Sequence, residues 1–429
     1  MIEQFNKLPL SELFESVIGG GTPPRAIPEY WNGSIPWASV KDFSDNELKL
    51  NKTQESITKL GLLNSTSKLI KTGTPIICLR MAVGRVAIAN KDVSINQDLK
   101  ALFTKGNIDS LYLVYLLDFS RSEVMRRSIG STVKGISTSE LLRIQVPFPE
   151  SLDTQQKIAT ILSTVDNLIE NTQSLIDKYT AVKQGMMADL FTRGIDLSGT
   201  SETNKNYGQL RPSITESPEL YQETELGWVA KDWKVDKLEN LTTKIIDGTH
   251  YTPTYTVEGV PFLRVTDVQS KEINLEKIKF ISEEEHKLLI KRCNPEIGDI
   301  LYSKNGTIGI PKIVNWNWKF SVFVSLCLIK PNHKKINNKY LELVLTSTVA
   351  WTQIRVRAKQ GTVTNLHLEE IREFLIPLPS FDEQTAIVDR AITFQNRIDG
   401  EKSYLEKLRN EKKGLMQDLL TGKVRVKID

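Results

Sequence analysis

The side chains that could carry out covalent chemistry are few in this chain and lie far apart. Its histidines and cysteines are His250, His286, His333, His367, Cys78, Cys293 and Cys327. No two of the histidines stand at the spacing of metal ligands, and the cysteines fit neither a metal-binding nor a disulfide pattern. We therefore expect no metal site, and we expect the three thiols to be reduced, as in a cytosolic protein.

The sequence motifs of common nucleotide and nucleic-acid enzymes are also missing. There is no G-x-x-x-x-G-K-[ST] phosphate loop, and Gly19–Gly21 does not follow a strand of a dinucleotide-binding unit. Residues 21–25 (GTPPR) lack both ends of the [DNS]-P-P-[YFW] motif of methyl transfer to base amino groups, and no acidic pair precedes Glu-x-Lys at nuclease spacing. These absences predict a recognition protein without a catalytic residue or cofactor of its own.

Positive charge is concentrated in two parts of the chain. Residues 1–149 contain 18 Lys and Arg against 14 Asp and Glu, and residues 233–379 contain 21 against 16. Residues 150–232 are acidic, with 7 against 13, and residues 380–429 are nearly neutral, with 10 against 9. Two basic regions suit two contacts with a polyanion, although a chance scatter of a few charges is the alternative.

The two basic regions are also related by an internal repeat. The matched landmarks are 35–42 with 260–267, 73–84 with 298–309, Val146–Pro149 with Ile376–Pro379, Gln155 with Gln384, and Met187–Leu190 with Met416–Leu419. The matched positions occur in the same order, and the difference between their residue numbers is nearly constant: it is 225 in the first part of the unit, 230 at its end and 229 along the helix. Chance is therefore a weak explanation. The chain therefore predicts two similar units of roughly 150 residues, each followed by a helix.

Each unit is expected to be an α+β domain with many short strands. In the first unit, apolar and β-branched runs bounded by Gly, Pro, Asn or Asp predict strands at 34–40, 74–79, 83–89 and 142–146. Residues 111–127 predict a helix with one apolar side, and GGGTPP at 19–24 predicts a loop.

The period of the apolar residues changes after each unit. From Thr154 onward they fall at i, i+3, i+4 and i+7, which predicts an amphipathic helix of roughly 57 Å that ends at Gly194. A sister helix is predicted from Asp382 to Leu420, ending at Gly422. Since one such helix cannot bury its own apolar stripe, we expect the two to pair as an antiparallel coiled coil and to hold the units a fixed distance apart. The alternative is that each helix packs on its own unit.

This pattern divides the chain into five parts: 1–149, 150–197, 198–232, 233–379 and 380–429. They correspond to a first domain, its long helix, a polar linker with the start of the second copy, a second domain and a C-terminal long helix. No stretch reaches the ~18 apolar residues of a membrane helix, and the N-terminus carries acids and lacks the long apolar core of a signal peptide. We therefore expect a cytoplasmic protein that makes no membrane contact.

The repeated motifs, taken together, resemble the specificity (S) subunits of type I restriction–modification systems. Each copy carries T-V-x-[GN]-[IL], then [VI]-P-[FL]-P, then a glutamine at the helix start, then G-x-M-x-D-L-[FL]-T. These motifs stand at Thr132–Ile136 and Thr362–Leu366, Val146–Pro149 and Ile376–Pro379, Gln155 and Gln384, and Gly185–Thr192 and Gly414–Thr421. The resemblance covers nearly the whole chain.

Two departures from the family pattern lie in the first copy. It has no counterpart of the E-L-G…W start of the second copy at Glu225–Trp233, so Phe5–Leu13 would have to serve. It also has Thr154 where the second copy has Glu383, and we expect little loss because threonine can still cap a helix.

The resemblance implies an α+β protein with two similar target-recognition domains, separated by two long antiparallel helices and related by a pseudo-two-fold axis. Each domain would read one half of an interrupted double-stranded DNA site, and the helices would set the spacer and dock methyltransferase (M) subunits. Adenine methylation with S-adenosylmethionine would belong to two M subunits, and ATP- and Mg-dependent translocation and cleavage to two restriction (R) subunits. Two alternatives are a protein adaptor without DNA specificity and an unrecognised DNA-modifying enzyme.

Under this resemblance, DNA-contacting residues are expected in loops near the shared landmarks. The candidates are Arg25, Lys41, Arg80, Arg85 and Lys134 in the first copy, and Arg264, Lys304, Asn305, Arg357, Lys359 and Gln360 in the second. Arg80 aligns with Asn305, and different chemistry at equivalent positions is what an asymmetric site requires. For each residue alone, a solvated surface charge is the alternative. Trp316 and Trp318 could stack on a deformed base, although packing at the core or rim is favoured.

Overall fold

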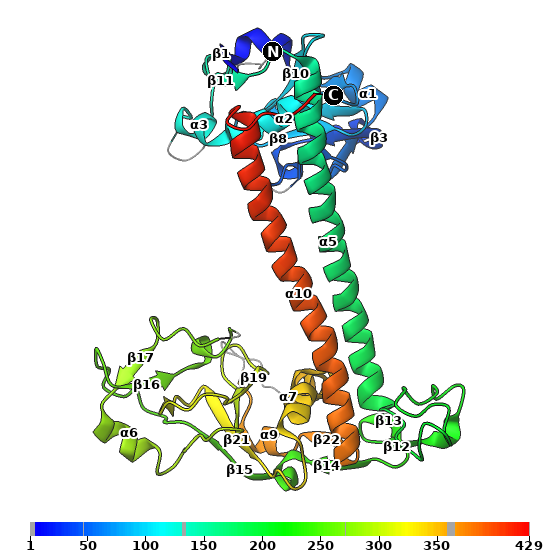
Figure 1. The fold of residues 1–429 in the computed structure, drawn as a ribbon, viewed down its shortest axis with the longest axis vertical. Coiled ribbons are helices and arrows are strands. Elements are labelled where there is room, and N and C mark those ends of the chain that lie inside the picture. Colours follow the sequence, from blue (N-terminus) through cyan, green and yellow to red (C-terminus); the bar gives the residue numbers. More distant parts are fainter. Residues whose placement is uncertain (1–4, 46, 131–133, 271, 358–364, 429) are drawn as a thin grey trace. The chain divides into compact units, whose positions relative to one another are not determined.

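The computed structural model describes residues 5–45, 47–130, 134–270, 272–357 and 365–428. The chain forms two compact units, Met1–Leu175 with Glu401–Asp429, and Ile176–Gly400. Each unit contains one α+β domain and part of each of two long helices (Figure 1). No helix in the described ranges is both long and apolar enough to cross a membrane.

The first domain is built on short strands. Strand β1 (Asn6–Pro9) pairs with β11 (Gln145–Phe148). One sheet has the order β2 (Phe14–Gly19), β10 (Leu99–Thr104), β7 (Pro75–Cys78), β8 (Val86–Ala89) and β4 (Lys49–Leu50). Another has the order β5 (Glu55–Ile57), β3 (Trp31–Ala38), β9 (Val93–Ile95) and β6 (Lys68–Ile70). The helical elements are η1 (Leu10–Leu13), η2 (Pro28–Tyr30), η3 (Val40–Asp42), α1 (Lys59–Leu63), α2 (Ser110–Phe119), α3 (Arg121–Arg126) and α4 (Thr138–Leu142).

The second domain uses the same kinds of elements. Strand β14 (Lys234–Lys237) pairs with β22 (Leu375–Leu378). One sheet has the order β15 (Thr242–Asp247), β21 (Leu326–Pro331), β18 (Ile300–Ser303) and β19 (Pro311–Ile313), and another has β17 (Lys279–Ile281), β16 (Val260–Leu263) and β20 (Ser321–Val322). The helical elements are η5 (Leu238–Leu241), η6 (Val265–Asp267), α6 (Glu283–Leu289), α7 (Asn338–Thr346), α8 (Thr348–Arg357) and α9 (Leu368–Arg372).

The sequence repeat is a repeat of topology. The order β2-β10-β7-β8 in the first domain corresponds to β15-β21-β18-β19 in the second, and β5-β3-β9 corresponds to β17-β16-β20. In both domains the middle strand of the smaller sheet pairs antiparallel on one side and parallel on the other. Equivalent loops of the two domains can therefore be compared position by position.

Most predicted elements of the first domain are present, with shifted ends. Strands β3, β7, β8 and β11 fall in or next to the four predicted runs, although Leu142 belongs to α4 rather than to a strand. The helix predicted over residues 111–127 is two helices, because Ser120 (φ −81°, ψ 1°) leaves the helical conformation between α2 and α3. Helix α3 contributes Arg121 and Met125 to the pocket described below.

The two long helices are α5 (Leu152–Thr192) and α10 (Phe381–Leu420). Thr154 lies in the first turn of α5 rather than at the capping position expected for it, because the helix begins at Leu152. The Oγ of Ser151 instead accepts a hydrogen bond from the Thr154 N–H at 3.3 Å, as the Oγ of Ser380 does from Glu383 at 3.3 Å. The predicted terminal glycines follow the helices in the left-handed region, with φ +66° at Gly194 and +72° at Gly422.

The repeated glutamine ties the start of each long helix to its domain. The Oε1 of Gln155 accepts from the Asp109 N–H at 2.9 Å, and its Nε2 donates to the Pro149 carbonyl at 3.1 Å. Gln384 makes the same two kinds of bond, to Asn337 at 2.8 Å and to Pro379 at 3.1 Å. Both side chains are buried, so each amide satisfies backbone groups that water cannot reach.

Each domain core receives an end of both long helices. In the first unit, the core includes Ile158 and Leu162 of α5 with Leu419 of α10. In the second unit, it includes Phe191 of α5 and Ile387 of α10. The apolar stripes are thus buried in part by the domains, and each helix contributes to both cores rather than to that of its own unit alone.

Residues 193–233 contain more secondary structure than the sequence predicted for a polar linker. They contain η4 (Pro218–Leu220) and a hairpin of β12 (Tyr221–Thr224) and β13 (Gly227–Ala230). The buried carboxylate of Glu383 accepts hydrogen bonds from Arg211, from the Trp233 Nε1 at 3.0 Å and from the Ile195 N–H at 2.8 Å. One side chain of α10 therefore fastens this segment at both its ends.

Candidate nucleic-acid interface

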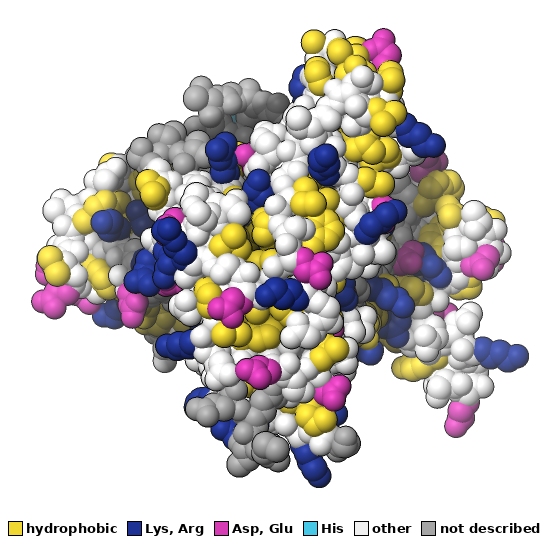
Figure 2. Space-filling model, turned by 90° about the horizontal axis from the view of Figure 1, so that it is seen from above, with side chains coloured by type: hydrophobic (Ala, Val, Ile, Leu, Met, Phe, Trp, Pro, Cys, Tyr) yellow, Lys and Arg dark blue, Asp and Glu magenta, His cyan; other side chains and the backbone are white. Residues whose placement is uncertain are grey.

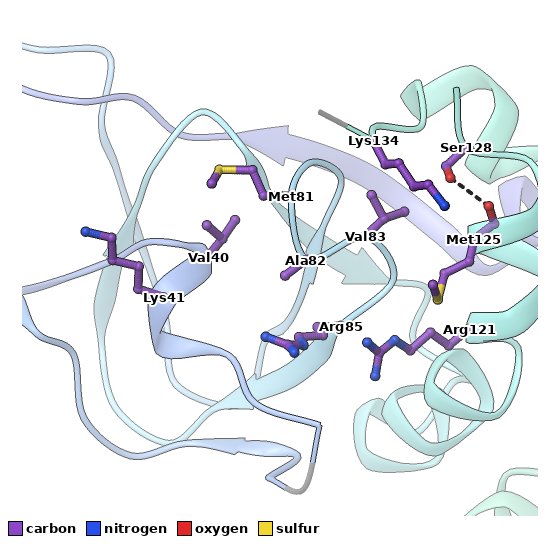
Figure 3. A pocket seen from close by; sticks show the side chains of 10 residues that line it. All are labelled: Val40, Lys41, Met81, Ala82, Val83, Arg85, Arg121, Met125, Ser128 and Lys134. Atoms are coloured by element: carbon purple, nitrogen blue, oxygen red, sulfur yellow. Dashed lines mark hydrogen bonds between the residues drawn. The ribbon is translucent and has the colours of Figure 1, made fainter. Parts of the chain in front are cut away.

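A pocket of about 320 Å³ in the first domain collects several of the predicted DNA-contacting side chains (Figure 3). It is lined by Val40, Lys41, Met81, Ala82, Val83, Arg85, Arg121, Met125, Ser128 and Lys134. Figure 3 shows Lys41 and Met81 at one side of the pocket and Lys134 at the other. Four cationic residues therefore line one hollow, which is a suitable arrangement for a polyanion.

One carboxylate aligns two of these cations. Asp45 accepts hydrogen bonds from Arg85, from Nε at 2.8 Å and from Nη2 at 3.0 Å, and another from Nη1 of Arg121. These bonds, Arg85 first, lower the pKa of the Asp45 carboxyl below its ordinary value. Arg85 also donates to the Phe43 carbonyl at 2.9 Å. The two guanidinium groups are thus fixed in position by one carboxylate.

The pocket forms because α3 approaches the turn between β7 and β8 very closely. Gly84 occupies this turn with φ +79°, and a Cβ added there would lie 2.9 Å from the Cγ of Arg121. Only glycine satisfies both the backbone angle and the close contact. On the opposite wall, Ser39 starts η3 by accepting from the Lys41 N–H at 3.3 Å, which fixes the position of Lys41.

The other two candidates of the first domain lie outside the pocket lining. The guanidinium of Arg25 is hydrogen-bonded to Glu55, with Nη2 2.9 Å from Oε2, and lies 3.9 Å from the ring centroid of Trp31. The hydrogen bond from Arg25 lowers the pKa of Glu55. Arg80 is two-thirds exposed, and its Nη1 is 3.8 Å from Asp98. Both arginines are accessible and already oriented by a carboxylate.

The candidates of the second domain are more engaged with the protein. Lys304 is buried, with its ammonium 3.3 Å from the carboxylate of Asp247, which also accepts from Arg292 at 2.6 Å. Arg264 pairs with Asp267 at 3.1 Å, and Arg357 donates to the Glu373 carbonyl at 2.7 Å. Lys304 in particular is held inside the fold by these contacts.

Two β-bridges show that one pair of candidates is equivalent in the two domains. Asn305 forms a β-bridge with Asn365, as Arg80 does with Gly135, which confirms that Arg80 and Asn305 are equivalent. Lys359 and Gln360 lie outside the described residues. Whether any of the eleven candidates contacts DNA stays a prediction.

The second domain replaces the cations of the pocket with other chemistry. A Cβ added at Gly309, the equivalent of Gly84, would meet the Cζ2 of Trp351 at 2.9 Å instead of an arginine. Trp351 thus occupies the place of Arg121, and the repeat aligns Arg85 with Ile310 and Lys41 with Thr266. The first pocket is cationic at Lys41, Arg85 and Arg121, whereas the equivalent positions of the second domain carry Thr266, Ile310 and Trp351, with Arg355 in place of Met125.

Sequence reasoning missed Arg121, Asp45 and Trp351. Arg121 and Trp351 lie in helices rather than loops, and only the offset of 230 between them could have related them. The surface seen in Figure 2 shows Lys and Arg side chains spread among hydrophobic ones, so charge alone does not single out the site.

The tryptophans of the second domain lie mainly against its core. Trp316 and Trp318 are stacked, with centroids 5.2 Å apart and planes at 19°, and both contact Phe320. All three belong to or border a buried cluster, and they line a cavity of about 520 Å³ with His286. Within the described ranges, no three His, Cys, Asp or Glu side chains form a group that could hold a metal ion.

Comparison with known proteins identifies a family. The sequence model of the type I restriction modification DNA specificity domain matches residues 2–180 and again residues 230–410. The type I restriction enzyme MjaIX and MjaVIII specificity subunits of Methanocaldococcus jannaschii are each 26% identical, covering 96% of this chain and 91% and 92% of their own lengths. The EcoR124I/EcoR124II specificity subunit of Escherichia coli is 32% identical over 157 residues, which is 35% of this chain and 38% of that one.

Solved structures share the fold. The S subunit of a type I restriction–modification system from M. genitalium superposes with a TM-score of 0.56 at 17% identity, covering 97% of this chain and 96% of that one. A chain from a structure of the type I R-M system gives a TM-score of 0.58 at 14% identity over 98% of both chains. These matches favour the specificity-subunit prediction over the adaptor and enzyme alternatives. With two matched domains that span most of its length, the chain belongs to the family of type I restriction–modification DNA specificity subunits.

Proposed function

We propose that each domain reads one half of an interrupted, asymmetric site in double-stranded DNA. The observation that carries this proposal is that equivalent positions of the two domains carry different chemistry, Arg121 and Arg85 in the first domain against Trp351 and Ile310 in the second. Two sites of one topology but different side chains suit two different half-sites. Lys41 and Lys134 would contact phosphates, and the aligned Arg85 and Arg121 would contact phosphate or the guanine edge.

We propose further that α5 and α10 form an antiparallel coiled coil, that they set the spacer between the half-sites, and that a pseudo-two-fold axis relates the two copies. Three contacts support the pairing. Asp166 and Lys412 are 2.6 Å apart in the first unit, and the Nζ of Lys183 is 2.6 Å from Gln395 in the second. Arg397 adds a cation–π contact over the ring of Tyr179 at 4.4 Å.

The sequence division into 1–149, 150–197, 198–232, 233–379 and 380–429 is proposed as the functional division. The long helices would dock two methyltransferase subunits, and two restriction subunits would join this complex. This chain would be non-catalytic and cytoplasmic, and S-adenosylmethionine, ATP and Mg²⁺ would act in the partner subunits. The family membership supports this assignment of roles.

Methylation-resolving sequencing tests the proposal. DNA from cells that express this chain with its M subunit is compared with DNA from cells that lack this chain. The expected result is an interrupted two-part motif with N6-methyladenine in each half, found only when the chain is present. No new motif from a soluble, assembled complex would overturn the proposal. Arg85→Gln should relax the motif in one half only, because Arg85 belongs to one domain.

A further inference from the structure

Met81 stands in an unfavourable backbone conformation at the rim of the cationic pocket. Its φ is +60°, in the left-handed region that costs a non-glycine residue energy. The Ala82 N–H donates to the Arg80 carbonyl at 2.7 Å, so Met81 is the central residue of a tight γ-turn in its rare positive-φ form. The Met81 N–H donates to the Lys134 carbonyl at 3.1 Å, which holds this turn against the opposite pocket wall.

The second copy has a glycine at the position with the same positive φ. Met81 aligns with Gly306, whose φ is +76°. A Cβ added at Gly306 would meet nothing within 4 Å, so a side chain at this position extends into open space and is not needed for packing. The first copy therefore carries both strain and a side chain that its own fold does not require. Strain of this kind is kept where a side chain has a function.

The surroundings of Met81 indicate what that function is. Its side chain is 67% exposed, although it is a large apolar group, and it borders the pocket that contains Lys41, Arg85 and Lys134. The cations are suited to phosphates and to the acceptor atoms of guanine, but a thioether is suited to neither. Among the bases, thymine alone presents a methyl group in the major groove.

We propose that Met81 is a specificity-determining residue of the first domain and contacts the C5 methyl group of a thymine in its half-site. This inference rests on the proposed function, because it requires that the first domain reads DNA. The strained turn places the flexible thioether beside cations that hold the phosphate backbone, so the methyl group and the side chain shield each other from water. Gly306 leaves the second domain without this contact.

The test is a double-mutant cycle that combines replacement of a thymine in the DNA with substitution of Met81 in the protein. The chain assembled with its M subunit is titrated with duplexes that carry the mapped site, in which each thymine in turn is replaced by deoxyuridine, which lacks only the methyl group. We expect one position at which uracil weakens binding by the wild-type complex about fourfold, the factor for one buried methyl-sized group. In Met81→Gly the same replacement has no effect, and in Met81→Leu part of the effect returns.

Controls separate this contact from damage to the fold. Met81→Gly should have a melting temperature equal to or above that of the wild type, because glycine removes the strain. Leu63→Ala, which truncates an 80% exposed leucine on α1 outside the pocket, should keep the full uracil effect.

The outcomes also separate this inference from the proposed function. A wild-type complex with no methylation motif would refute the proposed function itself. A normal motif would refute the inference alone if no thymine in it is sensitive to uracil, or if Met81→Gly keeps the sensitivity.

Discussion

Replacing Glu383 with glutamine should loosen the segment between the two domains. The residue is 2% exposed, and its two carboxylate oxygens accept from the Ile195 N–H, the Trp233 Nε1 and both terminal nitrogens of Arg211. Glutamine keeps one acceptor oxygen and turns an NH₂ group toward donors. It also leaves the buried guanidinium with the Arg193 carbonyl and with one carboxylate, that of Asp232 at 2.9 Å, whose side chain is 66% exposed.

The expected cost follows from these contacts. Breaking a buried ion pair costs about 3–5 kcal/mol, and the remaining Asp232 contact argues for the lower end, about 3 kcal/mol. Hydrogen exchange of the Ile195 amide reports this opening directly, and it should accelerate roughly 100-fold in Glu383→Gln. Glu369→Gln is the matched control, because Glu369 is 78% exposed at 3.6 Å from Arg372 and should change exchange little. An acceleration below about threefold in Glu383→Gln would show that the carboxylate does not anchor this segment.

Four further predictions follow from contacts described above. Gln384→Leu removes the side-chain partners of the Asn337 N–H and the Pro379 carbonyl, so calorimetry should show that the free energy of unfolding of the second unit falls by about 2 kcal/mol. The control Gln156→Leu, at an exposed position, should change the free energy of unfolding very little. Hydrogen bonds from Arg85 and Arg121 lower the pKa of Asp45, so the ionised carboxylate stabilises the folded protein fully above the unfolded pKa of about 4, and this contribution disappears as pH falls through the folded pKa. Urea titrations should therefore show the free energies of unfolding of wild type and Asp45→Asn converging below about pH 4. A difference that stays constant with pH would contradict this. Arg121→Gln should reduce the slope of log K for DNA against log salt by about 0.9, and an unchanged slope would place Arg121 off the phosphates. Burial raises the pKa of Cys78 and of Cys293 to about 12, so a thiol reagent at neutral pH should modify neither until the protein unfolds.

The sequence predicted the features that depend on local pattern. The long helices followed from apolar periodicity, and their terminal glycines from the left-handed conformation that glycine permits. The helix over 111–127 was predicted without its break at Ser120, because a single serine inside an apolar pattern is not a sequence signal for a helix end. Local signals fix which elements form more reliably than where they end.

The features that sequence reasoning missed depend on distant contacts. Glu383 meets Arg211 across 172 positions, and no spacing rule relates them. Arg121 reaches the pocket only because Gly84 lets α3 come close, and Lys304 was predicted to be accessible although Asp247 holds it inside the fold. In each case the contact depends on which side chains the fold buries together, and the neighbouring residues in the sequence do not determine this.

The glycines that end the two long helices have a consequence for the gene. A Cβ at Gly194 would meet the ring of Trp233, and a Cβ at Gly422 would meet the ring of Phe5 at 2.8 Å. The end of α10 thus lies against the first residues of the first domain, as the end of α5 lies against the first residues of the second. A circularly permuted gene, opened within 198–208 and joined by a short peptide between Ile428 and Phe5, would encode both of these contacts unchanged. Which half is translated first is therefore a matter of gene arrangement and not a requirement of the fold.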